Sequence, residues 1–439
     1  MTSLRAFRKS RPPTPTRRAW LLVAAAFLVA CLAAAAFSFQ HQQRPAQAAT
    51  SPGPAWYNAA PYVMPLANNP PSLSTVMAAT GARVFTLAFI VADNGCTPAW
   101  EADSGLIDVA ADSQAGPMIN AVRAAGGDVV VSFGGYNGTK LGQVCGTPQA
   151  TAAAEQAVIT KYSLRAIDLD LEEPEYENAA AINNELGAAQ ILQANNPGLM
   201  ITVTLPGTTS GTGYFGQQLL NTARSLGYRP SSYSIMPFDG GFNGASSQIS
   251  ALQSFHTILM NTFGWDSATA YAYEGISSMN GRTDSGEYFY QSDFQTVLSF
   301  VKSNHLARFT FWSVNRDRQC TPPDNNGNLS ATCSSVPQND WDFTRIVTQF
   351  AQTTAATPTA APSSTPPPTA TTVPTLTPSP TPTSPASSNC TGIAPWSPTT
   401  AYTGGSKVTY NGYLWQAKWW TYNDVPGGPA GVWVQLGRC

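Results

Sequence analysis

Short runs of β-branched and aliphatic residues alternate with amphipathic stretches along residues 57–351 of this 439-residue chain. Such runs are typical of buried parallel strands, and the stretches between them carry apolar residues at helical spacing. The runs predict strands at Tyr62–Met64, Val84–Ile90, Val129–Phe133, Leu164–Leu171, Leu199–Leu205, Tyr233–Met236, Ala268–Tyr273 and Arg308–Trp312. The intervening stretches predict helices at Gly116–Ala125, Glu177–Ala194, Tyr214–Leu226 and Phe294–Asn304. Eight strands, each followed by a helix, predict an α/β fold of the (β/α)8 TIM barrel type. A doubly wound open sheet is the alternative, but no glycine-rich phosphate turn follows the first strand.

A change in composition marks the end of this domain. Residues 352–389 consist almost wholly of Thr, Pro, Ala and Ser. A segment of this kind cannot bury a core and prefers extended conformations, so it predicts a semi-rigid linker. The linker separates the barrel domain, 57–351, from a small domain, 390–439.

The N-terminal 48 residues have the pattern of a secretory signal peptide. Arg and Lys without acidic residues precede an apolar run from Trp20 to Phe39, and Ala46-Gln47-Ala48 supplies a small-x-small cleavage site. We therefore expect a secreted, extracellular protein. The apolar run is long for a signal peptide, so an uncleaved membrane anchor is the alternative.

Charge and histidine content exclude several classes of function. Removal of residues 1–48 takes away seven of the 23 basic residues, which leaves 16 basic against 25 acidic residues. No basic patch remains that would suggest nucleic-acid binding. Only His256 and His305 survive, so a histidine-based triad or a multi-histidine metal site is not expected. We expect no metal and no cofactor.

The cysteines indicate disulfide bonds. Cys31 lies in the export signal, and the other six form three short-range couples: Cys96 with Cys145, Cys320 with Cys333, and Cys390 with Cys439. An even number in an exported protein predicts disulfides, and the absence of Cys-x-x-Cys spacing argues against zinc. Six cysteines allow fifteen connectivities, so proximity is only a guide to the pairing.

The fourth predicted strand contains an unusual row of carboxylates in the sequence "RAIDLDLEEPE". Asp168, Asp170 and Glu172 alternate with aliphatic residues, so they share one face of the strand at a spacing of roughly 6.6 Å. In a barrel that face points inward, toward the C-terminal mouth where active sites lie. Three carboxylates cannot all ionise in such a site, so at least one pKa should rise, as a general acid requires. A solvated strand end and a site for a divalent cation are the alternatives.

This segment resembles the catalytic strand of glycoside hydrolase family 18, the chitinases, whose motif is Asp-Gly-x-Asp-x-Asp-x-Glu. Asp168, Asp170 and Glu172 match that motif, whereas Arg165 and Ala166 depart from it. Three further segments resemble the family in the correct strand order: Ser-x-Gly-Gly at Ser132–Gly135, Met-x-Tyr-Asp at Met236–Asp239, and the eighth-strand tryptophan at Trp312.

The resemblance implies a retaining, substrate-assisted hydrolysis in which the substrate's own 2-acetamido oxygen is the nucleophile. Glu172 would protonate the glycosidic oxygen, and Asp170 would orient the acetamido group. Asp168 would share a proton with Asp170, and Asp239 would hydrogen-bond the distorted sugar or its acetamide.

The expected substrate contacts follow from the same motifs. Trp312 would form the floor of the central subsite, and Met236 and Ser132 would lie against the sugar. The family has Tyr where this chain has Phe238, and loss of that hydroxyl would cost on the order of 1–3 kcal/mol in the transition state. Tyr136, Tyr233 and Tyr273 are the alternatives for replacing it. The segment Gly275–Tyr290 is too short for the α+β insertion of some family members, so we expect an open cleft.

The small domain resembles the family 5/12 chitin-binding modules, with their Ala-x-Trp-Trp-Thr signature at residues 417–421. So short a chain needs a staple, and Cys390 and Cys439 stand at its two ends. We expect three of its aromatic residues in the core: Trp396, Trp415 and Trp433. By resemblance, three others would contact chitin: Tyr402, Trp419 and Trp420.

The expected function is therefore that of a secreted, monomeric chitinase acting on chitin and chitooligosaccharides, without stable membrane association once the signal is removed. A non-catalytic chitin-binding protein is one alternative, against which Glu172 argues. An endo-β-N-acetylglucosaminidase acting on glycoproteins is another, against which the C-terminal module argues.

Overall fold

The computed structural model describes residues 52–355 and 390–439, the latter with gaps at 391, 399, 403–404, 418–420, 423–424 and 429–431. These residues belong to two compact units, which are described separately. The expected signal peptide, 1–48, and residues 356–389 of the expected linker lie outside the described residues.

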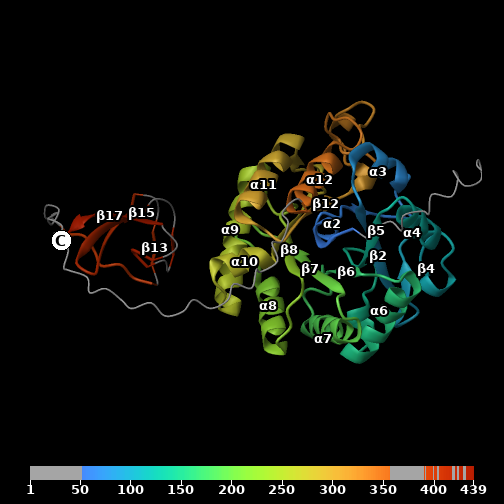
Figure 1. Cartoon of the computed structure of the whole chain (residues 1–439), viewed down its shortest axis with the longest axis horizontal. Helices are drawn as coiled ribbons and strands as arrows, with labels where there is room; N and C mark the ends of the chain where they lie inside the picture. Colours follow the sequence, from blue (N-terminus) through green and yellow to red (C-terminus); the bar gives the residue numbers. More distant parts are fainter. Residues whose placement is uncertain are drawn as a thin grey trace, which may run out of the picture. The chain divides into compact units, whose positions relative to one another are not determined.

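Eight parallel strands form the first unit, as the hydrophobic pattern predicted. They are β1 (Tyr62–Val63), β2 (Val84–Asp93), β5 (Asp128–Gly134), β6 (Ala166–Asp170), β7 (Met200–Pro206), β8 (Ser232–Met236), β9 (Glu274–Met279) and β12 (Arg308–Trp312). Each strand pairs in parallel with the next in the series. The last strand lies beside the first, since the Thr310 hydroxyl donates to the carbonyl of Ala60 at 2.5 Å. The (β/α)8 barrel is confirmed (Figure 1).

Helices surround the strands (Figure 1). They are α2 (Pro54–Asn58), α3 (Leu73–Thr80), α4 (Ala115–Ala124), α5 (Leu141–Val144), α6 (Pro148–Tyr162), α7 (Ala179–Asn195), α8 (Tyr214–Leu226), α9 (Gly244–Phe263), α10 (Ser267–Tyr273), α11 (Gln291–Asn304) and α12 (Asp342–Ala355). The four expected helices are present as α4, α7, α8 and α11. The last helix extends to Ala355, into the segment expected to begin the linker, because Phe350 and Ala351 are buried against the core.

One predicted strand was wrong. Residues 268–273 form helix α10, and the seventh barrel strand is β9, which starts directly after it. The Asp266 side chain caps this helix by accepting from the amide of Thr269 at 2.7 Å. Tyr271 also stacks on His256 with ring centroids 3.6 Å apart, so local capping and tertiary packing together outweigh the alternating pattern.

Two hairpins extend loops at the carboxyl ends of the strands. Strands β3 (Thr97–Trp100) and β4 (Ile107–Asp108) continue from β2 as an antiparallel extension. Strands β10 (Gly281–Arg282) and β11 (Tyr288–Phe289) form a small antiparallel pair between β9 and α11. This pair lies within Gly275–Tyr290, the segment that was expected to be too short for an α+β insertion.

The six cysteines that follow the expected export signal are joined in the pairs that proximity suggested. The Cα atoms of Cys96 and Cys145 are 4.8 Å apart, those of Cys320 and Cys333 are 5.2 Å apart, and those of Cys390 and Cys439 are 5.4 Å apart. Across the described residues, the helices fall short of the length and apolarity that a membrane span requires.

The second unit contains small antiparallel sheets. Strands β14 (Lys407–Tyr410), β15 (Tyr413–Ala417) and β17 (Trp433–Arg438) form one sheet, and β13 (Ala401–Tyr402) pairs with β16 (Thr421–Tyr422). Among the expected core aromatics, Trp433 is buried, and Trp396 and Trp415 are half-buried against the same cluster. The disulfide between Cys390 and Cys439 joins the ends of this unit.

Candidate active site

Carboxylate and aliphatic side chains alternate along β6, so they lie on opposite faces of the strand. Ile167 and Leu169 pack into the hydrophobic core between the strands and the helices. Asp168 and Asp170 point the other way, into the barrel, and Glu172 is the second residue after the end of the strand. The acidic row therefore rises from the barrel interior to its C-terminal mouth.

Asp168 is fully buried and accepts hydrogen bonds from three hydroxyl groups. The Tyr62 hydroxyl donates to its Oδ2 at 2.8 Å, and the Ser132 hydroxyl donates to the same oxygen at 2.7 Å. The Thr204 hydroxyl donates to Oδ1 at 2.7 Å. The Arg308 guanidinium lies 3.9 Å from Oδ1 and is itself buried. Three hydroxyl donors and a nearby guanidinium thus surround the Asp168 carboxyl group beneath the cavity.

Asp170 is buried, yet its Oδ1 has no hydrogen-bond partner within the described residues. Burial raises the pKa of this carboxyl well above its ordinary value, and the nearby charges of Glu172 and Asp168 raise it further. Asp170 also lines the main cavity, so this unpartnered oxygen lies close to the space that a ligand could fill.

Two glycines allow the backbone of β5 to approach Asp170. Gly134 has a φ of 110°, and a Cβ atom added there would lie 2.0 Å from the Asp170 carbonyl oxygen. The amide of Gly135 donates to that same carbonyl at 2.8 Å. The two glycines therefore bring β5 close to the acidic strand, and any side chain at Gly134 would push β5 away from it.

Glu172 is half-buried at the mouth of the barrel. Burial is the main cause that raises the pKa of its carboxyl to about 8, and the charge of Glu173 adds to it. The Lys140 ammonium opposes this shift. Lys140 is itself buried, and its Nζ donates to the carbonyls of Asn137 and Gly138. At neutral pH, a carboxyl with this pKa is mostly protonated, as a general acid must be.

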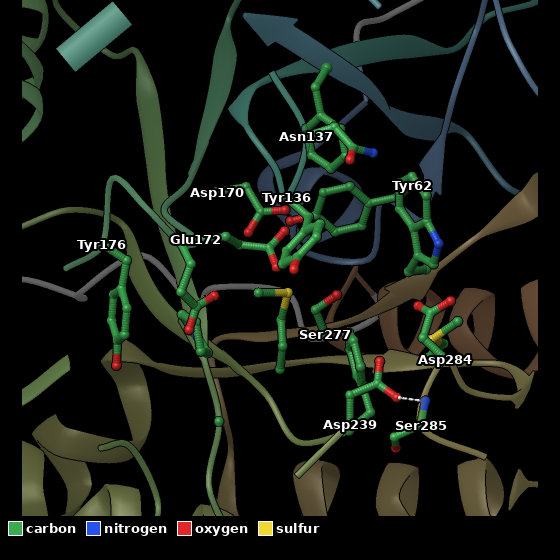
Figure 2. A pocket seen from close by; sticks show the side chains of 18 of the residues that line it. Tyr62, Tyr136, Asn137, Asp170, Glu172, Tyr176, Asp239, Ser277, Asp284 and Ser285 are labelled. Atoms are coloured by element: carbon green, nitrogen blue, oxygen red, sulfur yellow. Dashed lines mark hydrogen bonds between the residues drawn. The ribbon is translucent and has the colours of Figure 1, made fainter. Parts of the chain in front are cut away.

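These groups open onto a cavity of about 1070 Å³, large enough for several sugar rings (Figure 2). In Figure 2, Asp170 and Glu172 enter the cavity from one side, and Asp239 and Asp284 enter it from another. Seven of the residues expected at the site line the cavity: Asp170, Glu172, Asp239, Trp312, Met236, Phe238 and Tyr136.

Two expected site residues lie outside the cavity lining. Asp168 and Ser132 are fully buried beneath it, and Ser132 contacts Asp168 through its hydroxyl. Of the three tyrosines considered as replacements for the hydroxyl missing at Phe238, only Tyr136 lines the cavity. Tyr233 stacks on Phe263 in the core instead.

Aromatic rings form much of the cavity wall. Trp312 stacks on Phe89 with centroids 5.4 Å apart and planes 12° from parallel, and Tyr62 packs against both rings. Tyr136 and Tyr214 are 67% and 70% exposed at the rim, where a ligand could cover them.

Three residues of the cavity lining were not expected from the sequence, because none lies in a motif: Tyr62, Tyr214 and Asp284. The only sequence signal for these residues is their position at the ends of predicted strands or in the loops that follow, where barrel active sites lie.

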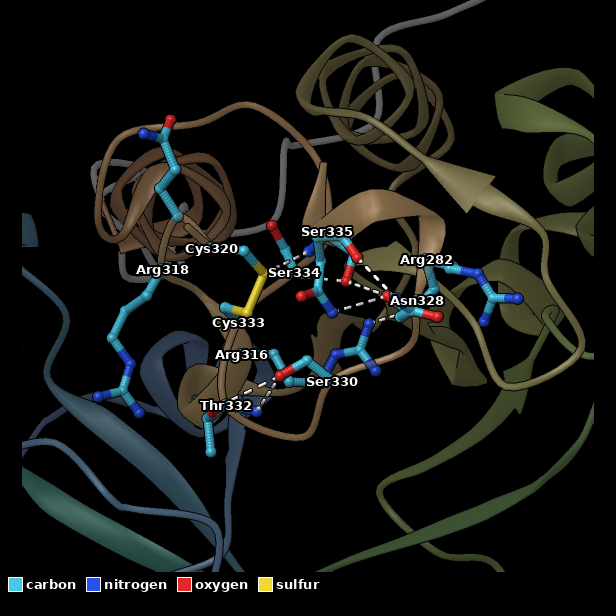
Figure 3. The surroundings of a disulfide bond; sticks show 12 residues. Arg282, Arg316, Arg318, Cys320, Asn328, Ser330, Thr332, Cys333, Ser334 and Ser335 are labelled. Carbon is cyan, nitrogen blue, oxygen red and sulfur yellow. Dashed lines mark hydrogen bonds between the residues drawn. A yellow bond between two sulfur atoms is a disulfide. The ribbon is translucent and has the colours of Figure 1, made fainter. Parts of the chain in front are cut away.

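Another part of the wall comes from a disulfide-closed loop. Residues 329–331 line the cavity, and they lie within the loop closed by Cys320 and Cys333 (Figure 3). The Ser335 hydroxyl donates to the carbonyl of Asn328 at 2.7 Å, which ties the loop to its own base. The disulfide thus restricts a segment that borders the cavity.

In the C-terminal unit, Tyr402 is the one expected chitin contact among the described residues. Tyr402 is half-buried, packs edge-on against Trp433 at 5.3 Å, and accepts a hydrogen bond from the amide of Ser397 at 2.8 Å. Trp419 and Trp420 lie outside the described residues. Within the described part of the chain, there is no cluster of His, Cys, Asp and Glu that could hold a metal ion.

Comparison with known proteins agrees with this geometry. Residues 395–434 match the model of carbohydrate-binding module family 5/12. The chain is 28% identical over 278 residues to a probable bifunctional chitinase/lysozyme of Escherichia coli strain K12. This alignment covers 59% of this chain and 30% of that protein. It is also 28% identical over 276 residues to Endochitinase 11 of Metarhizium anisopliae, over 59% of this chain and 52% of that protein. The matched region thus spans about half or less of these relatives.

Solved structures show the same fold. The catalytic domain of a hyperthermophilic chitinase from Pyrococcus furiosus superposes with a TM-score of 0.59 at 24% identity, and the match covers 68% of this chain and 96% of that chain. Mutants of that domain have been solved with chito-oligosaccharides. In its sequence similarity and its barrel fold, the large unit resembles chitinase catalytic domains, and residues 395–434 of the small unit match carbohydrate-binding module family 5/12.

Proposed function

We propose that this protein is a secreted chitinase that hydrolyses β-1,4 linkages between N-acetylglucosamine units with retention of configuration. The observation that carries the proposal is the pairing of Asp170, buried with an unpartnered oxygen, and Glu172, whose pKa is raised to about 8, at the mouth of the barrel. The first can accept a hydrogen bond from an acetamide N–H, and the second can supply a proton to a leaving group.

In the proposed reaction, Glu172 protonates the glycosidic oxygen while the substrate's acetamido oxygen attacks the anomeric carbon. Asp170 accepts a hydrogen bond from the acetamide nitrogen and stabilises the positive charge of the oxazolinium intermediate. Asp168, with its three hydroxyl donors, carries negative charge while Asp170 holds the proton of the pair. While Asp170 holds that proton, it adds no negative charge beside Glu172, so Glu172 can release its own proton to the leaving group. Water then opens the intermediate, with the ionised Glu172 as base.

Sugar binding would use the aromatic wall. The stacked rings of Trp312 and Phe89 offer a flat apolar surface for the central sugar, and Tyr136 and Tyr214 offer further surfaces at the rim. Tyr136 is also the proposed replacement for the hydroxyl missing at Phe238. We assign Ser132 to holding Asp168 rather than to contact with sugar, because it is buried beneath the cavity.

The C-terminal module is proposed to hold the barrel near insoluble chitin. A linked module raises the effective concentration of the catalytic domain at the polymer without changing the site itself. Its proposed chitin contacts are Tyr402, Trp419 and Trp420. The monomeric state and the cleavage of residues 1–48 during export belong to the same proposal.

Incubation with colloidal chitin and, separately, with a high-mannose glycoprotein tests the proposal. The wild type should release chitooligosaccharides from chitin and leave the glycan intact, and Glu172→Gln should release nothing while still sedimenting with chitin. Release from the glycoprotein alone would identify an endo-β-N-acetylglucosaminidase. Binding to chitin without any release by the wild type would identify a non-catalytic binding protein.

A further inference from the structure

The segment after β8 carries Phe238 and Asp239 into the cavity, although it belongs to no helix or strand. Asp239 has a φ of 55°, in the left-handed region that residues with a Cβ atom rarely occupy. Its side chain is exposed, so burial does not hold it in place. The position of this carboxylate must therefore depend on contacts from elsewhere in the chain.

Glu287 makes these contacts from the hairpin segment between β10 and β11. Its Oε2 accepts a hydrogen bond from the amide of Asp239 at 2.8 Å. Its Oε1 accepts from the amides of Gly241 and Phe242, both at 2.7 Å. One carboxylate thus satisfies three main-chain donors of a segment that has no partners in regular structure.

The contact is reciprocal. Asp239 Oδ1 accepts from the amide of Ser285 at 2.6 Å, on the same hairpin as Glu287 (Figure 2). The hairpin is anchored in turn, because the amide of Arg282 donates to the carbonyl of Ser334 at 2.9 Å. Among the described residues, Asp239 Oδ2 makes no hydrogen bond, so one oxygen is held by the protein and the other remains available to a ligand.

We propose that Glu287 is a positioning residue for catalysis, which fixes the backbone of Asp239 and thereby directs its free carboxylate oxygen into the cavity. Glu287 does not line the cavity, so it acts through Asp239 and not on the sugar. The inference rests on the proposed function, because it assigns Asp239 to the substrate in a glycosidase reaction.

Kinetics of Glu287→Gln on a soluble chitooligosaccharide test this role. The amide keeps the size of the side chain but replaces one acceptor oxygen with an NH2 group that faces main-chain N–H donors. We expect kcat to fall roughly tenfold or more, with KM within about twofold of the wild-type value.

Asp293→Asn is the matched control. The Asp293 carboxylate also accepts from two main-chain amides, those of Ala245 at 3.0 Å and Tyr290 at 2.8 Å, but it does not line the cavity. This variant should keep kcat near the wild-type value. Equal losses in the two variants would overturn the inference, because they would reflect general loosening of the loops.

A double-mutant cycle with Asp239→Asn isolates the coupling. If Glu287 acts through Asp239, adding Glu287→Gln to Asp239→Asn should lower kcat little further. Fully additive losses would contradict the proposal. Glu287→Asp, which keeps the charge but is one methylene shorter, is a second variant should Glu287→Gln fold poorly. It should also lower kcat more than Asp293→Asn does.

Amide hydrogen exchange separates this inference from the proposed function. Residues 238–242 should exchange faster in Glu287→Gln than in the wild type, and this can be measured whether or not the protein hydrolyses chitin. Unchanged exchange in that segment would overturn the positioning role alone. A wild type without activity would overturn the proposed function, while the exchange difference would still report on the contact.

Discussion

Replacement of Ser132 by Ala should slow hydrolysis without weakening substrate binding. Ser132 is one of three hydroxyl donors to the buried carboxylate of Asp168, at 2.7 Å, and it has no contact with the cavity. With one donor removed, negative charge on Asp168 becomes less favourable, and the proton shared with Asp170 moves toward Asp168. Asp170 then carries charge beside Glu172, which disfavours proton transfer from Glu172 to the leaving group.

The size of the effect follows from the type of hydrogen bond. A hydrogen bond to a charged group contributes about 1.5–3 kcal/mol. If this free energy is lost only in the transition state, kcat should fall by about 10- to 150-fold. KM should change little, because Ser132 lies beneath the sugar site.

Steady-state kinetics on a soluble chitooligosaccharide measure both constants, and Ser234→Ala is the matched control. Ser234 lies in β8, is equally buried, and its hydroxyl has no partner within the described residues. Ser234→Ala should behave like the wild type. If the two variants have the same kcat, the proposed support of Asp168 by Ser132 is refuted.

Three further predictions concern charge and domain organisation. Activity should decline as pH rises through about 8, the pKa of Glu172, because the acid is then ionised. The Lys140 ammonium lowers that pKa, so Lys140→Met should move the alkaline limb of kcat/KM to higher pH, whereas Lys140→Arg should leave the limb in place. An unmoved limb in Lys140→Met would contradict the assignment of this limb to Glu172. Burial raises the pKa values of Glu155, Glu175 and Glu185, so the folded state holds extra protons above pH 4.5, and its stability falls with rising pH by about 1.4 kcal/mol per pH unit for each such proton. Glu155→Gln should make the free energy of unfolding in urea depend less steeply on pH. An unchanged slope of that free energy against pH would argue against a raised pKa at Glu155. Ending the chain at Ala355 should reduce hydrolysis of insoluble chitin far more than that of soluble oligosaccharides, and equal losses would show that the module is no anchor.

The barrel was predictable because its signals are local. The buried strands are aliphatic runs, and an inward-facing carboxylate row such as that of Asp168, Asp170 and Glu172 follows from the period of two along a strand. The same period misled at residues 268–273, where the capping side chain of Asp266 and the stacking of Tyr271 favour a helix. The cap was readable in the sequence, whereas the stacking partner was not.

Contacts between distant segments account for what sequence reasoning missed. The role of Ser132 depends on the register between β5 and β6, which places it opposite Asp168. Glu287 acts on amides 45 to 48 residues before it, and no local pattern marks a carboxylate as an acceptor for a distant loop. Tyr62 and Tyr214 likewise reach the cavity only because the barrel brings their segments to the same mouth.

The anomeric configuration of freshly released sugar tests the central claim most directly. A defined chitooligosaccharide can be cleaved and its products resolved by anomer before mutarotation. Attack by the acetamido oxygen, with Asp170 holding the acetamide and Glu172 as acid and base, predicts products that first appear with the β configuration of the substrate. Products that first appear as the α anomer would contradict the account.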